Sequence, residues 1–435
     1  MTAKKQVVKK VRQVLPSSAV RGLEETYRRG RTKAVSARYG NPASGLKVIG
    51  VTGTNGKTTT INFINEILKE AGLKTAMFST ALIEINGVAK LNELNATVPS
   101  MNLLMQFFRD AKKAKVDYVL LEVSSHALHQ HKLDGVTFTA AVMTNITQDH
   151  LDYHKTMEEY ARIKTKLFKG SPKYIVLNRD DEWFDTFDTY PARAHKITYG
   201  THETAEAKID YVKLYKKGSE ARVVLDGNTT LELATALPGK YNIYNMVAAA
   251  SLAYLLGIDL THIVEGVANL EGVPGRYERA VEGLDYEVIV DYAHTPDGLE
   301  KLLEAAKAVT KNRVILVFGA TGDRDKGKRP IMGEIATRLA DRIILTDEEN
   351  YTEDAGGIRD QVFEGIENAG GAGKTTEIAD RREAIKKALS IAKKDDTILI
   401  TGLGHEKFRI WDGAPMPWND ADVVREVLAE MKKAK

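Results

Sequence analysis

Cysteine is absent from the 435-residue chain, so the protein has no disulfide bond, no thiolate metal site and no cysteine nucleophile. A chain without cysteine fits a reducing compartment, and we expect a cytoplasmic protein. There is also no run of eighteen apolar residues and no apolar signal-peptide core, which argues against a transmembrane helix and against secretion. The length predicts two or three domains of ordinary globular composition.

Positive charge is concentrated at the N-terminus. Residues 1–45 carry eleven lysines and arginines against two glutamates, while the whole chain has a net charge of only +3. Val7, Val11 and Val14 recur at roughly helical spacing before Pro16, which predicts a short amphipathic basic helix. Packing of this arm on the body is the simpler interpretation, and a surface for anionic lipid or an acidic partner is the alternative. No aromatic residues interleave with the charges in the way that nucleic-acid binding would require, so no nucleic-acid partner is expected.

Short apolar runs alternate with helical patterns, which is the rhythm of β-α-β units and of a mostly parallel sheet. Runs typical of buried strands lie at 47–51, 117–125, 138–146 and 174–178, and helical patterns lie near 57–71, 101–114 and 157–168. The stretch 209–233 alternates at period two and predicts an antiparallel meander at the edge of that sheet. Helices are expected to begin near Tyr241 and Thr261.

The same rhythm restarts after VPGR (273–276). Strands are predicted at 286–293, 313–319, 342–346 and 396–402, and helices near 296–309, 328–340, 355–368, 379–394 and 421–433. We therefore expect an α/β protein with a basic helical arm over residues 1–45, a mostly parallel central domain over 46–275, and a Rossmann-like α/β domain over 276–435.

The stretch GVTGTNGKTTT (50–60) follows a predicted strand and precedes a predicted helix. Its backbone N–H groups, freed by glycine, suit the oxygens of a phosphate at a helix N-terminus. The usual spacing of such a loop requires glycine at position 51, where Val51 stands, so this is a variant of the P-loop. Lys57 is expected to reach the β- and γ-phosphates, and the Thr58 hydroxyl to bind Mg²⁺.

The motif TGTNGKTT resembles the ATP loop of the Mur ligase family, the ATP-dependent amide ligases of bacterial cell-wall synthesis. Within that family the resemblance is strongest to the enzymes that add the third residue of the stem peptide. The supporting motifs follow in order over about 46–435: EVSSHAL (122–128), TNITQDHLDYH (144–154), YARIKTKLF (160–168), GKYNIYN (239–245), PGRYE (274–278), DYAHTPD (291–297), FGATGDRDKGKRP (318–330) and GLGHE (402–406).

The resemblance implies a P-loop-type ATPase domain in the centre and an amino-acid-binding domain at the C-terminus. It assigns Asn245 to the adenine, Asp291 to the ribose and Arg276 to the phosphates, with His294 near the nucleotide. Helix capping and a strand-end turn are the ordinary structural roles for Asn245 and Asp291. The expected nucleotide-binding residues are Gly53, Thr54, Asn55, Gly56, Lys57, Thr58, Thr59, Asn245, Arg276, Asp291 and His294.

Two Mg²⁺ ions are expected beside the ATP. Glu122 ends a buried strand, where a carboxylate can bind a metal or simply pair with a neighbouring charge. The resemblance makes His150 a ligand of the second ion, with Asp149, Asp152 and His154 as supports. It also implies that Lys164 is carbamylated, with Lys166 as the neighbouring alternative. The expected metal-binding residues are Thr58, Glu122, His150 and Lys164, and the expected catalytic residues are Lys57, Glu122, His150 and Lys164.

These parts imply one reaction. ATP converts a carboxylate into an acyl phosphate, an amine attacks its carbonyl carbon, and phosphate leaves as an amide forms. Magnesium and Lys57 offset the crowding of negative charge as the carboxylate approaches the γ-phosphate. No enzyme nucleophile is needed, which agrees with the absence of cysteine.

The resemblance places the muramoyl part of the acceptor near Thr97, Ser125 and Lys132. Lysine stands at 132 where many relatives have arginine, so the charge remains but the bidentate fork is lost. Arg324 is expected to grip a carboxylate of the incoming amino acid, and Gly402 and Glu406 to contact its side chain.

The segment DEENYT (347–352) departs from the D-N-P-R pattern of enzymes that add diaminopimelate. Tyr351 stands where their arginine would clamp the distal carboxylate, and Glu348 and Glu349 precede it. Together with Glu406, these carboxylates favour a side chain that ends in an amine. We expect L-lysine or ornithine, with diaminopimelate second, and a solvated acidic turn at 348–349 is the structural alternative.

The 45 residues before the central domain are too few for the folded domain that holds the uridine nucleotide in such enzymes. The basic arm, where Arg28, Arg29 and Arg31 suit a diphosphate, could replace it, or another chain could, or the acceptor could lack UDP. The main hypothesis is a peptidoglycan amide ligase with small-molecule substrates. A related ligase with a non-UDP acceptor and a non-catalytic subunit are the alternatives, and the retention of Lys57 and its partners argues against the second.

Overall fold

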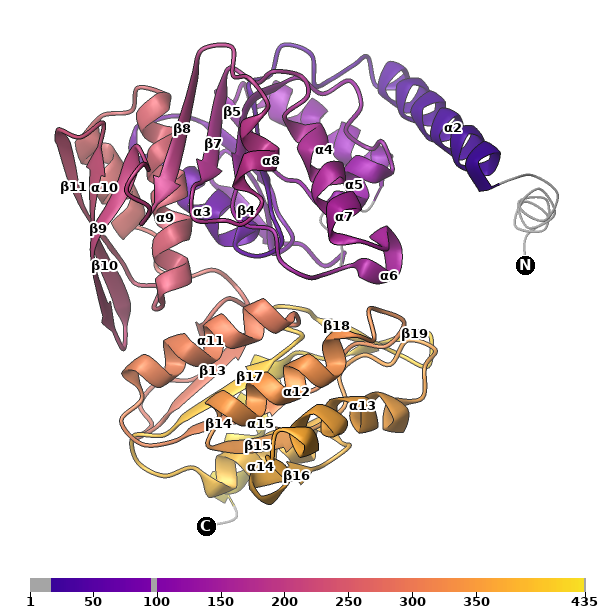
Figure 1. Ribbon diagram of the computed structural model, residues 1–435, viewed down its shortest axis with the longest axis vertical. Helices are drawn as coiled ribbons and strands as arrows, with labels where there is room; N and C mark the ends of the chain where they lie inside the picture. The colour runs from indigo at the N-terminus through magenta and orange to yellow at the C-terminus, as the bar shows by residue number, and fades with distance from the viewer. Residues whose placement is uncertain (1–16, 95–99, 434–435) are drawn as a thin grey trace.

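The computed structural model describes residues 17–94 and 100–433, which form two α/β units drawn one above the other in Figure 1. Within these residues, the first unit is built on an eleven-stranded sheet of order β11-β10-β9-β8-β7-β6-β1-β5-β2-β3-β4. Its strands are β1 (Val48–Thr52), β2 (Thr75–Phe78), β3 (Leu82–Ile85), β4 (Val88–Leu91), β5 (Tyr118–Glu122), β6 (Phe138–Met143), β7 (Tyr174–Asn178), β8 (His195–Gly200), β9 (Ala207–Tyr215), β10 (Gly218–Leu225) and β11 (Thr229–Thr235).

The middle of this sheet is parallel and both edges are antiparallel. The pairing of β1 with β5 sets Val51 opposite Glu122, and the pairing of β1 with β6 sets Thr52 opposite Met143. The carboxyl ends of three strands therefore lie side by side, and the loops that follow them meet above one edge of the sheet. Open α/β sheets bind their ligands at such an edge.

Helices cover both faces of the first sheet. One face carries α3 (Lys57–Glu70), α9 (Lys240–Leu255) and α10 (Leu260–Ala268) over an apolar core. The other face carries α4 (Met101–Lys113), α5 (Ser125–His129), α7 (Met157–Lys164) and α8 (Phe184–Asp188), with the short α6 (Leu151–His154) and η1 (Thr165–Leu167) beside them. Gly266 allows α10 to approach α3, because a Cβ there would lie 2.4 Å from the Ile67 Cα.

The second unit has a six-stranded sheet of the described residues, with the order β12-β13-β17-β14-β15-β16. Helices α11, α12 and α13 cover one face, and α14 and α15 cover the other. Its elements are β12 (Glu278–Arg279), β13 (Glu287–Asp291), α11 (Pro296–Val309), β14 (Val314–Phe318), α12 (Lys328–Leu339), β15 (Arg342–Leu345), α13 (Ala355–Asn368), η2 (Ala372–Lys374), β16 (Thr375–Glu377), α14 (Arg381–Ile391), β17 (Thr397–Thr401), the hairpin β18 (Phe408–Trp411) and β19 (Ala414–Pro417), and α15 (Asp420–Lys433).

The mixed, mostly parallel α/β architecture expected from the sequence is confirmed, including the meander β9-β10-β11 at a sheet edge. The sequence patterns did not indicate β2, β3, β4 or β8. The strands β2 to β4 are four residues each, too short to display a clear period, and β4 is exposed throughout. They form by pairing in turn, because β2 pairs with the edge of β5, β3 with β2, and β4 with β3.

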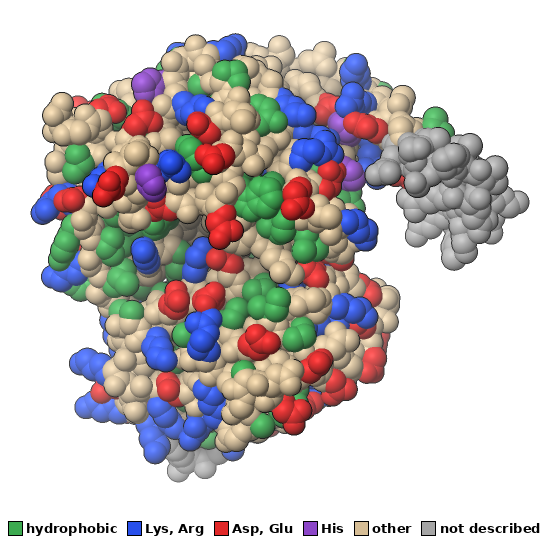
Figure 2. All heavy atoms as spheres, viewed as in Figure 1, with side chains coloured by type: hydrophobic (Ala, Val, Ile, Leu, Met, Phe, Trp, Pro, Cys, Tyr) green, Lys and Arg blue, Asp and Glu red, His purple; other side chains and the backbone are tan. Residues whose placement is uncertain are grey.

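The basic arm contributes helix α2 (Ser17–Arg38), which extends beside the first unit in Figure 1. Its C-terminal half packs on the body, where the Thr32 hydroxyl donates to the His131 carbonyl oxygen at 2.8 Å and Val35 and Tyr39 join the core. The helix expected around Val7 to Val14 lies outside the described residues. On the face in Figure 2, acidic and basic side chains are interspersed over both units. No described helix is both long enough and apolar enough to span a bilayer.

A buried ion pair fastens α14 to α15 in the second unit. Arg381 and Asp420 are both 0% exposed, and two hydrogen bonds of 2.8 and 2.7 Å join the guanidinium to the carboxylate. The arginine also donates to the Thr401 carbonyl oxygen at the end of β17. Removal of one partner from such a pair leaves an uncompensated buried charge.

We expect Arg381→Met to lower the free energy of unfolding by about 3–5 kcal/mol, measured by denaturant titration, because Asp420 would be left unpaired. The matched control is Arg382→Met in the same helix. Arg382 pairs with Glu426 and Glu430 at the surface, so its loss is expected to cost about 0–1 kcal/mol. Equal effects of the two substitutions would contradict this account.

Candidate active site

A cavity of about 1430 Å³ lies between the two units. Loops that follow β1, β5 and β6 form its wall on the first unit, and loops that follow β13, β14, β15 and β17 form its wall on the second. Several contacts join the units around it, among them Asn55 Nδ2, which donates to Asp297 Oδ2 at 2.7 Å, Arg276 Nη2, which donates to Thr58 Oγ1 at 3.3 Å, and His405 Nε2, which lies 3.0 Å from the Thr80 carbonyl oxygen.

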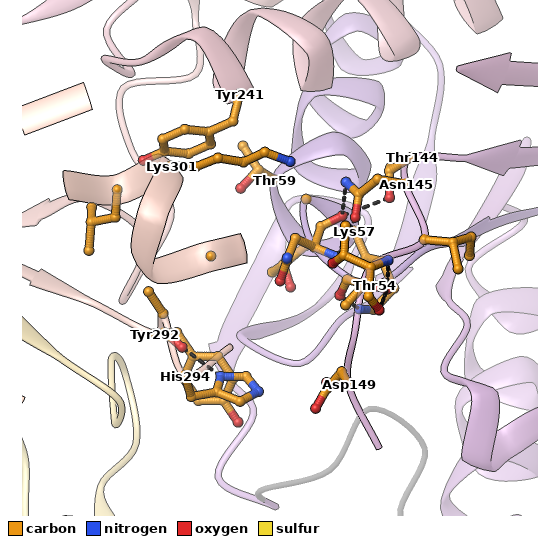
Figure 3. A pocket seen from close by; sticks show the side chains of 18 of the residues that line it. Thr54, Lys57, Thr59, Thr144, Asn145, Asp149, Tyr241, Tyr292, His294 and Lys301 are labelled. Carbon is orange, nitrogen blue, oxygen red and sulfur yellow. Dashed lines mark hydrogen bonds between the residues drawn. The ribbon is translucent and has the colours of Figure 1, made fainter. Parts of the chain in front are cut away.

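The glycine-rich loop lies at the start of α3, on the wall of this cavity (Figure 3). Gly53 and Gly56 have φ values of +152° and +82°, and a Cβ would lie 1.9 Å from Thr144 Oγ1 at the first position and 2.2 Å from Asn245 Oδ1 at the second. The loop is held by Asn145, which accepts from the N–H groups of residues 54 and 55. A glycine backbone packed this closely at a helix N-terminus is a cradle for anions and fits a triphosphate.

Two lysines bind carbonyl oxygens of the loop. Lys57 Nζ donates to the Thr54 oxygen and Lys164 Nζ to the Gly53 oxygen, each at 2.6 Å. Burial lowers the pKa of Lys57, and burial together with the charge of Lys57 holds the pKa of Lys164 well below its ordinary value. Lys57 lines the cavity, whereas Lys164 is 1% exposed and lies behind the loop, with its ammonium over the Tyr160 ring.

Thr58 and Glu122 meet at one point on the cavity wall, where the Thr58 hydroxyl donates to Glu122 Oε2 at 2.9 Å. The same carboxylate oxygen accepts from the Thr80 N–H. Among residues 17–94 and 100–433, no three histidine, aspartate or glutamate side chains converge into a preformed metal site. A hydroxyl and a carboxylate beside a phosphate cradle nevertheless fit Mg²⁺, which keeps phosphate and water oxygens among its ligands.

His150 lines the cavity in a left-handed backbone conformation, with φ at 57°, ahead of α6. Its Nε2 lies 3.2 Å from Asp149 Oδ2, and its N–H donates to the other oxygen of that carboxylate. Burial lowers the pKa of His150 to about 3, so the ring is neutral and has a nitrogen lone pair for a cation. A strained backbone at a cavity is common in functional sites.

Apart from Gly53, the residues assigned to the nucleoside and phosphates lie on the cavity wall. Asn245 contacts Thr60 and Asn242 within the first unit. Both carboxylate oxygens of Asp291 accept backbone N–H groups at 2.7 Å, so this side chain also shapes the turn after β13. Burial lowers the pKa of His294 to about 4, and its Nδ1 contacts the Tyr292 carbonyl oxygen, as Figure 3 shows.

Three carboxylates gather at the opposite end of the cavity, on the second unit. Glu348, Glu349 and Glu406 are 4%, 6% and 6% exposed, so the alternative of a solvated acidic turn is wrong. Burial first, and then the neighbouring carboxylates, raise the pKa of Glu349 to about 7 and that of Glu406 to about 9. Glu406 Oε2 is buried without a hydrogen-bond partner. This end of the cavity suits a cation.

Arg324 and Tyr351 stand beside these carboxylates. The guanidinium lies over the Tyr351 ring, 4.6 Å from its centre, and donates to the phenol oxygen at 3.1 Å. Gly402, at φ +112°, leaves room for Glu348, because a Cβ there would lie 2.2 Å from the Glu348 Oε2. Arg324 is therefore a cation that can hold one carboxylate next to a site for an amine.

The residues expected at the acceptor are not all in the cavity. Lys132 lines it, and burial and the charge of Arg31 on α2 lower its pKa. Ser125 is 1% exposed, is not on the wall, and contacts His154 Nε2 through its hydroxyl at 2.9 Å. Thr97 lies outside the described residues.

The structure adds residues to the wall that the sequence patterns did not single out as binding groups. Lys328 and Thr321 lie inside the quoted motif at 318–330, but nothing in the pattern separates them from their exposed neighbour Lys326. Tyr241 and Lys301, visible in Figure 3, line a further part of the cavity. Only the packing of loops from distant parts of the chain could identify these residues.

The pKa of Glu406 makes stability depend on pH. Because its folded-state pKa of about 9 lies above the ordinary 4.5, the stabilisation is complete below pH 4.5 and is lost as the pH rises towards 9. We expect Glu406→Gln, which stays neutral, to remove a slope of at most about 1.4 kcal/mol per pH unit from the unfolding free energy over this window. Glu364→Gln, exposed on α13, should keep the wild-type slope, and equal slopes in all three proteins would contradict the assignment.

Comparisons with known proteins identify the family. The Mur ligase middle domain matches residues 51–253, and the Mur ligase, glutamate ligase domain matches residues 275–404. The UDP-N-acetylmuramoyl-L-alanyl-D-glutamate--2,6-diaminopimelate ligase of Clostridium botulinum is 40% identical over 90% of this chain and 80% of its own length, and that of Clostridium tetani is 40% identical over 93% and 82%.

Solved structures agree with this result. A UDP-N-acetylmuramoyl-L-alanyl-D-glutamate--2,6-diaminopimelate ligase matches with a TM-score of 0.64 and 32% identity, covering 94% of this chain and 83% of its own. Folylpolyglutamate synthase of Mycobacterium tuberculosis shares the fold at 19% identity, with a TM-score of 0.71 over 86% of this chain and 92% of its own. The sequence motifs, the two-unit fold and these matches lead to one conclusion: the chain belongs to the Mur ligase family of ATP-dependent ligases.

Proposed function

We propose that the protein is a cytoplasmic amide ligase that uses ATP to join a diamino acid to the carboxylate of a UDP-N-acetylmuramoyl-dipeptide in peptidoglycan synthesis. One observation carries the proposal: a phosphate cradle with Lys57 and a cluster of buried carboxylates open on the same cavity from opposite units. The first suits a triphosphate and the second suits an amine. The names of the relatives from Clostridium support the acceptor.

The reaction we propose begins when an acceptor carboxylate oxygen attacks the γ-phosphorus of ATP, which forms an acyl phosphate and releases ADP. The amine of the incoming amino acid then attacks the carbonyl carbon. The C–O bond to phosphate breaks, and the leaving phosphate takes up the proton that the nitrogen loses. A closed cavity between two units favours this order, because it keeps water away from the acyl phosphate.

In this proposal Lys57 and the loop from Gly53 to Thr59 bind the phosphates, with Arg276 reaching them from the second unit. Thr58, Glu122 and His150 would hold magnesium, which when bound neutralises phosphate charge and polarises the γ-phosphoryl group. The neutral state of His150 is the state that a metal ligand requires. Asn245, Asp291 and His294 would surround the nucleoside.

Lys164 is proposed to carry a carbamate. Burial beside Lys57 favours the neutral amine, which is the form that adds carbon dioxide. The added group would replace a cation behind the phosphate loop with an anion, and an anion suits a metal-binding site better. In the structure the free amine donates to the Gly53 oxygen, so modification would exchange that hydrogen bond for a charge.

The acceptor is proposed to enter past Lys132, and the basic arm to supply charge for its anionic part. Arg28 and Arg29 are already paired with Glu24 and Glu25 within α2, at 3.3 and 2.8 Å. Of Arg28, Arg29 and Arg31, it is the charge of Arg31 that contributes, after burial, to the lowered pKa of Lys132. This supports Arg31 rather than its neighbours as the contact to a diphosphate.

The incoming amino acid is proposed to place its carboxylate on Arg324 and its side-chain ammonium among Glu348, Glu349 and Glu406. One arginine beside three carboxylates matches a side chain with an amine and no second carboxylate. We therefore propose L-lysine or ornithine ahead of diaminopimelate, with Tyr351 and Gly402 shaping the pocket.

The first test concerns Lys57. We expect Lys57→Ala to lower kcat for amide formation by about 10²- to 10³-fold, because a cation that offsets charge in the transition state is lost. ADP release and peptide product are measured together with purified UDP-N-acetylmuramoyl-dipeptide. Lys69→Ala at the far end of α3, where the ammonium pairs with Glu66, is the control and should leave kcat unchanged. Undiminished product from Lys57→Ala would refute the proposal.

The second test concerns the amino acid. We expect kcat/KM to be highest with lysine or ornithine, and Glu406→Gln to lower kcat/KM for lysine by about tenfold or more through the loss of a charge-assisted contact. Turnover with diaminopimelate and none with lysine would overturn the preference while leaving the ligase activity intact. Turnover only with a muramoyl dipeptide that lacks UDP would instead favour the non-UDP acceptor.

A further inference from the structure

Lys328 is a buried cation on the cavity wall to which the proposed reaction gives no role. It is the first residue of α12, it is 2% exposed, and its side chain lines the cavity. Within the described part of the chain, no hydrogen bond or ion pair engages its ammonium. Burial of an ammonium is costly unless an anion accompanies it. The site is thus one anion short.

The neighbours of Lys328 in the sequence differ from it in this respect. Lys326 is exposed and pairs with Glu353 at 2.6 Å, and Arg329 binds the same carboxylate at 2.8 Å and Gln361 at 2.8 Å. Their positive charges are therefore used within the second unit. Of Lys326, Lys328 and Arg329, only Lys328 lines the cavity without an ion-pair partner among the described residues.

The groups that face Lys328 come from both units. Its ammonium lies within electrostatic reach of Asp149 on the first unit, and of His294 and Glu348 on the second. These carboxylates are already engaged, because Asp149 contacts His150 through both oxygens and Glu348 accepts from the Thr321 hydroxyl. None of them is the missing partner.

Asp149 shows that Lys328 lies near the phosphate loop. The carboxylate of Asp149 lies within electrostatic reach of both Lys57 and Lys328. Figure 3 shows Asp149 pointing into the cavity below the loop, with His294 on the other side. Lys57 and Lys328 therefore approach the same region from opposite units. Lys328 also borders the carboxylate end, because it acts on Glu348.

We infer that Lys328 is a catalytic residue that binds the phosphoryl group as it passes from ATP to the acceptor carboxylate and leaves again as phosphate. This inference rests on the proposed function. A phosphoryl group in transfer is the anion that lies between a triphosphate cradle and an amine site. The P–O bond to ADP breaks as the acceptor oxygen bonds to phosphorus, and the C–O bond breaks later, so the same phosphate oxygens need a cation in both steps.

The experiment compares Lys328→Ala, Lys328→Arg and the control Lys326→Ala. We expect Lys328→Ala to lower kcat by about 10²- to 10³-fold, with the KM values for ATP and amino acid changing less than about threefold. Lys328→Arg should retain part of the activity, because it keeps the charge. Added methylammonium should restore part of the kcat of Lys328→Ala alone. Lys326→Ala should behave as wild type.

A binding measurement gives a second readout. We expect inorganic phosphate to bind the ADP-saturated wild-type protein in calorimetric titration, and Lys328→Ala to weaken that binding about tenfold while the affinity for ADP stays the same. A loss confined to the amino-acid KM would place Lys328 on the amino acid and overturn the inference. Unchanged kcat and phosphate binding in Lys328→Ala would overturn it as well.

These outcomes separate the inference from the proposed function. If the wild-type protein makes no amide from ATP, acceptor and amino acid, the proposed function fails, but the comparison of phosphate binding still tests Lys328. If Lys328→Ala unfolds, as circular dichroism would show, Lys328→Gln decides, because glutamine removes the charge and keeps most of the side-chain volume. Weaker phosphate binding and lower kcat in the folded glutamine variant support the inference, and wild-type values for both contradict it.

Discussion

The close packing of the phosphate loop against the loop after β6 is the constraint on which the site depends. No side chain fits at Gly53, because the Thr144 hydroxyl occupies the space, or at Gly56, where Asn245 does. Two lysines, Lys57 and Lys164, bind carbonyl oxygens of the same loop. The carbonyl groups are thus engaged by lysine, and the N–H groups at the start of α3 remain for phosphate oxygens. Every other element of the site is arranged around this backbone.

The cavity wall carries charged groups of both signs. Lys57 lies in the phosphate loop of the first unit, and three carboxylates line the cavity from the second unit. Burial disfavours the charged form of each group, which lowers the pKa of His150 and raises those of Glu349 and Glu406. Such a cavity suits the phosphates of one substrate and the amine of another. Both units are required for the site, because the phosphate loop lies on the first and the carboxylates lie on the second.

Much of the fold and the site could be predicted from particular stretches of the sequence. Long apolar runs predicted the parallel strands, and the motifs after them predicted that Lys57, Glu122 and Glu406 lie at strand ends. Prediction failed for the four-residue strands β2 to β4, which form by pairing one after another from the edge of β5. The sequence also left a solvated acidic turn as an alternative for residues 348–349, which are buried in the structure. Burial of a carboxylate depends on which loops cover it, and a sequence pattern does not record that.

The sequence by itself determined the family, the order of the longer strands and helices, and the residue types at their ends, because these follow from local periodicity and contiguous motifs. Only the tertiary structure decided which of those residues share a cavity. It placed Lys164 and Ser125 behind the wall and brought Lys328 onto it, next to groups more than a hundred residues away. The reason is that burial and charge depend on contacts between distant segments, and those contacts exist only after the two sheets and their loops have packed together.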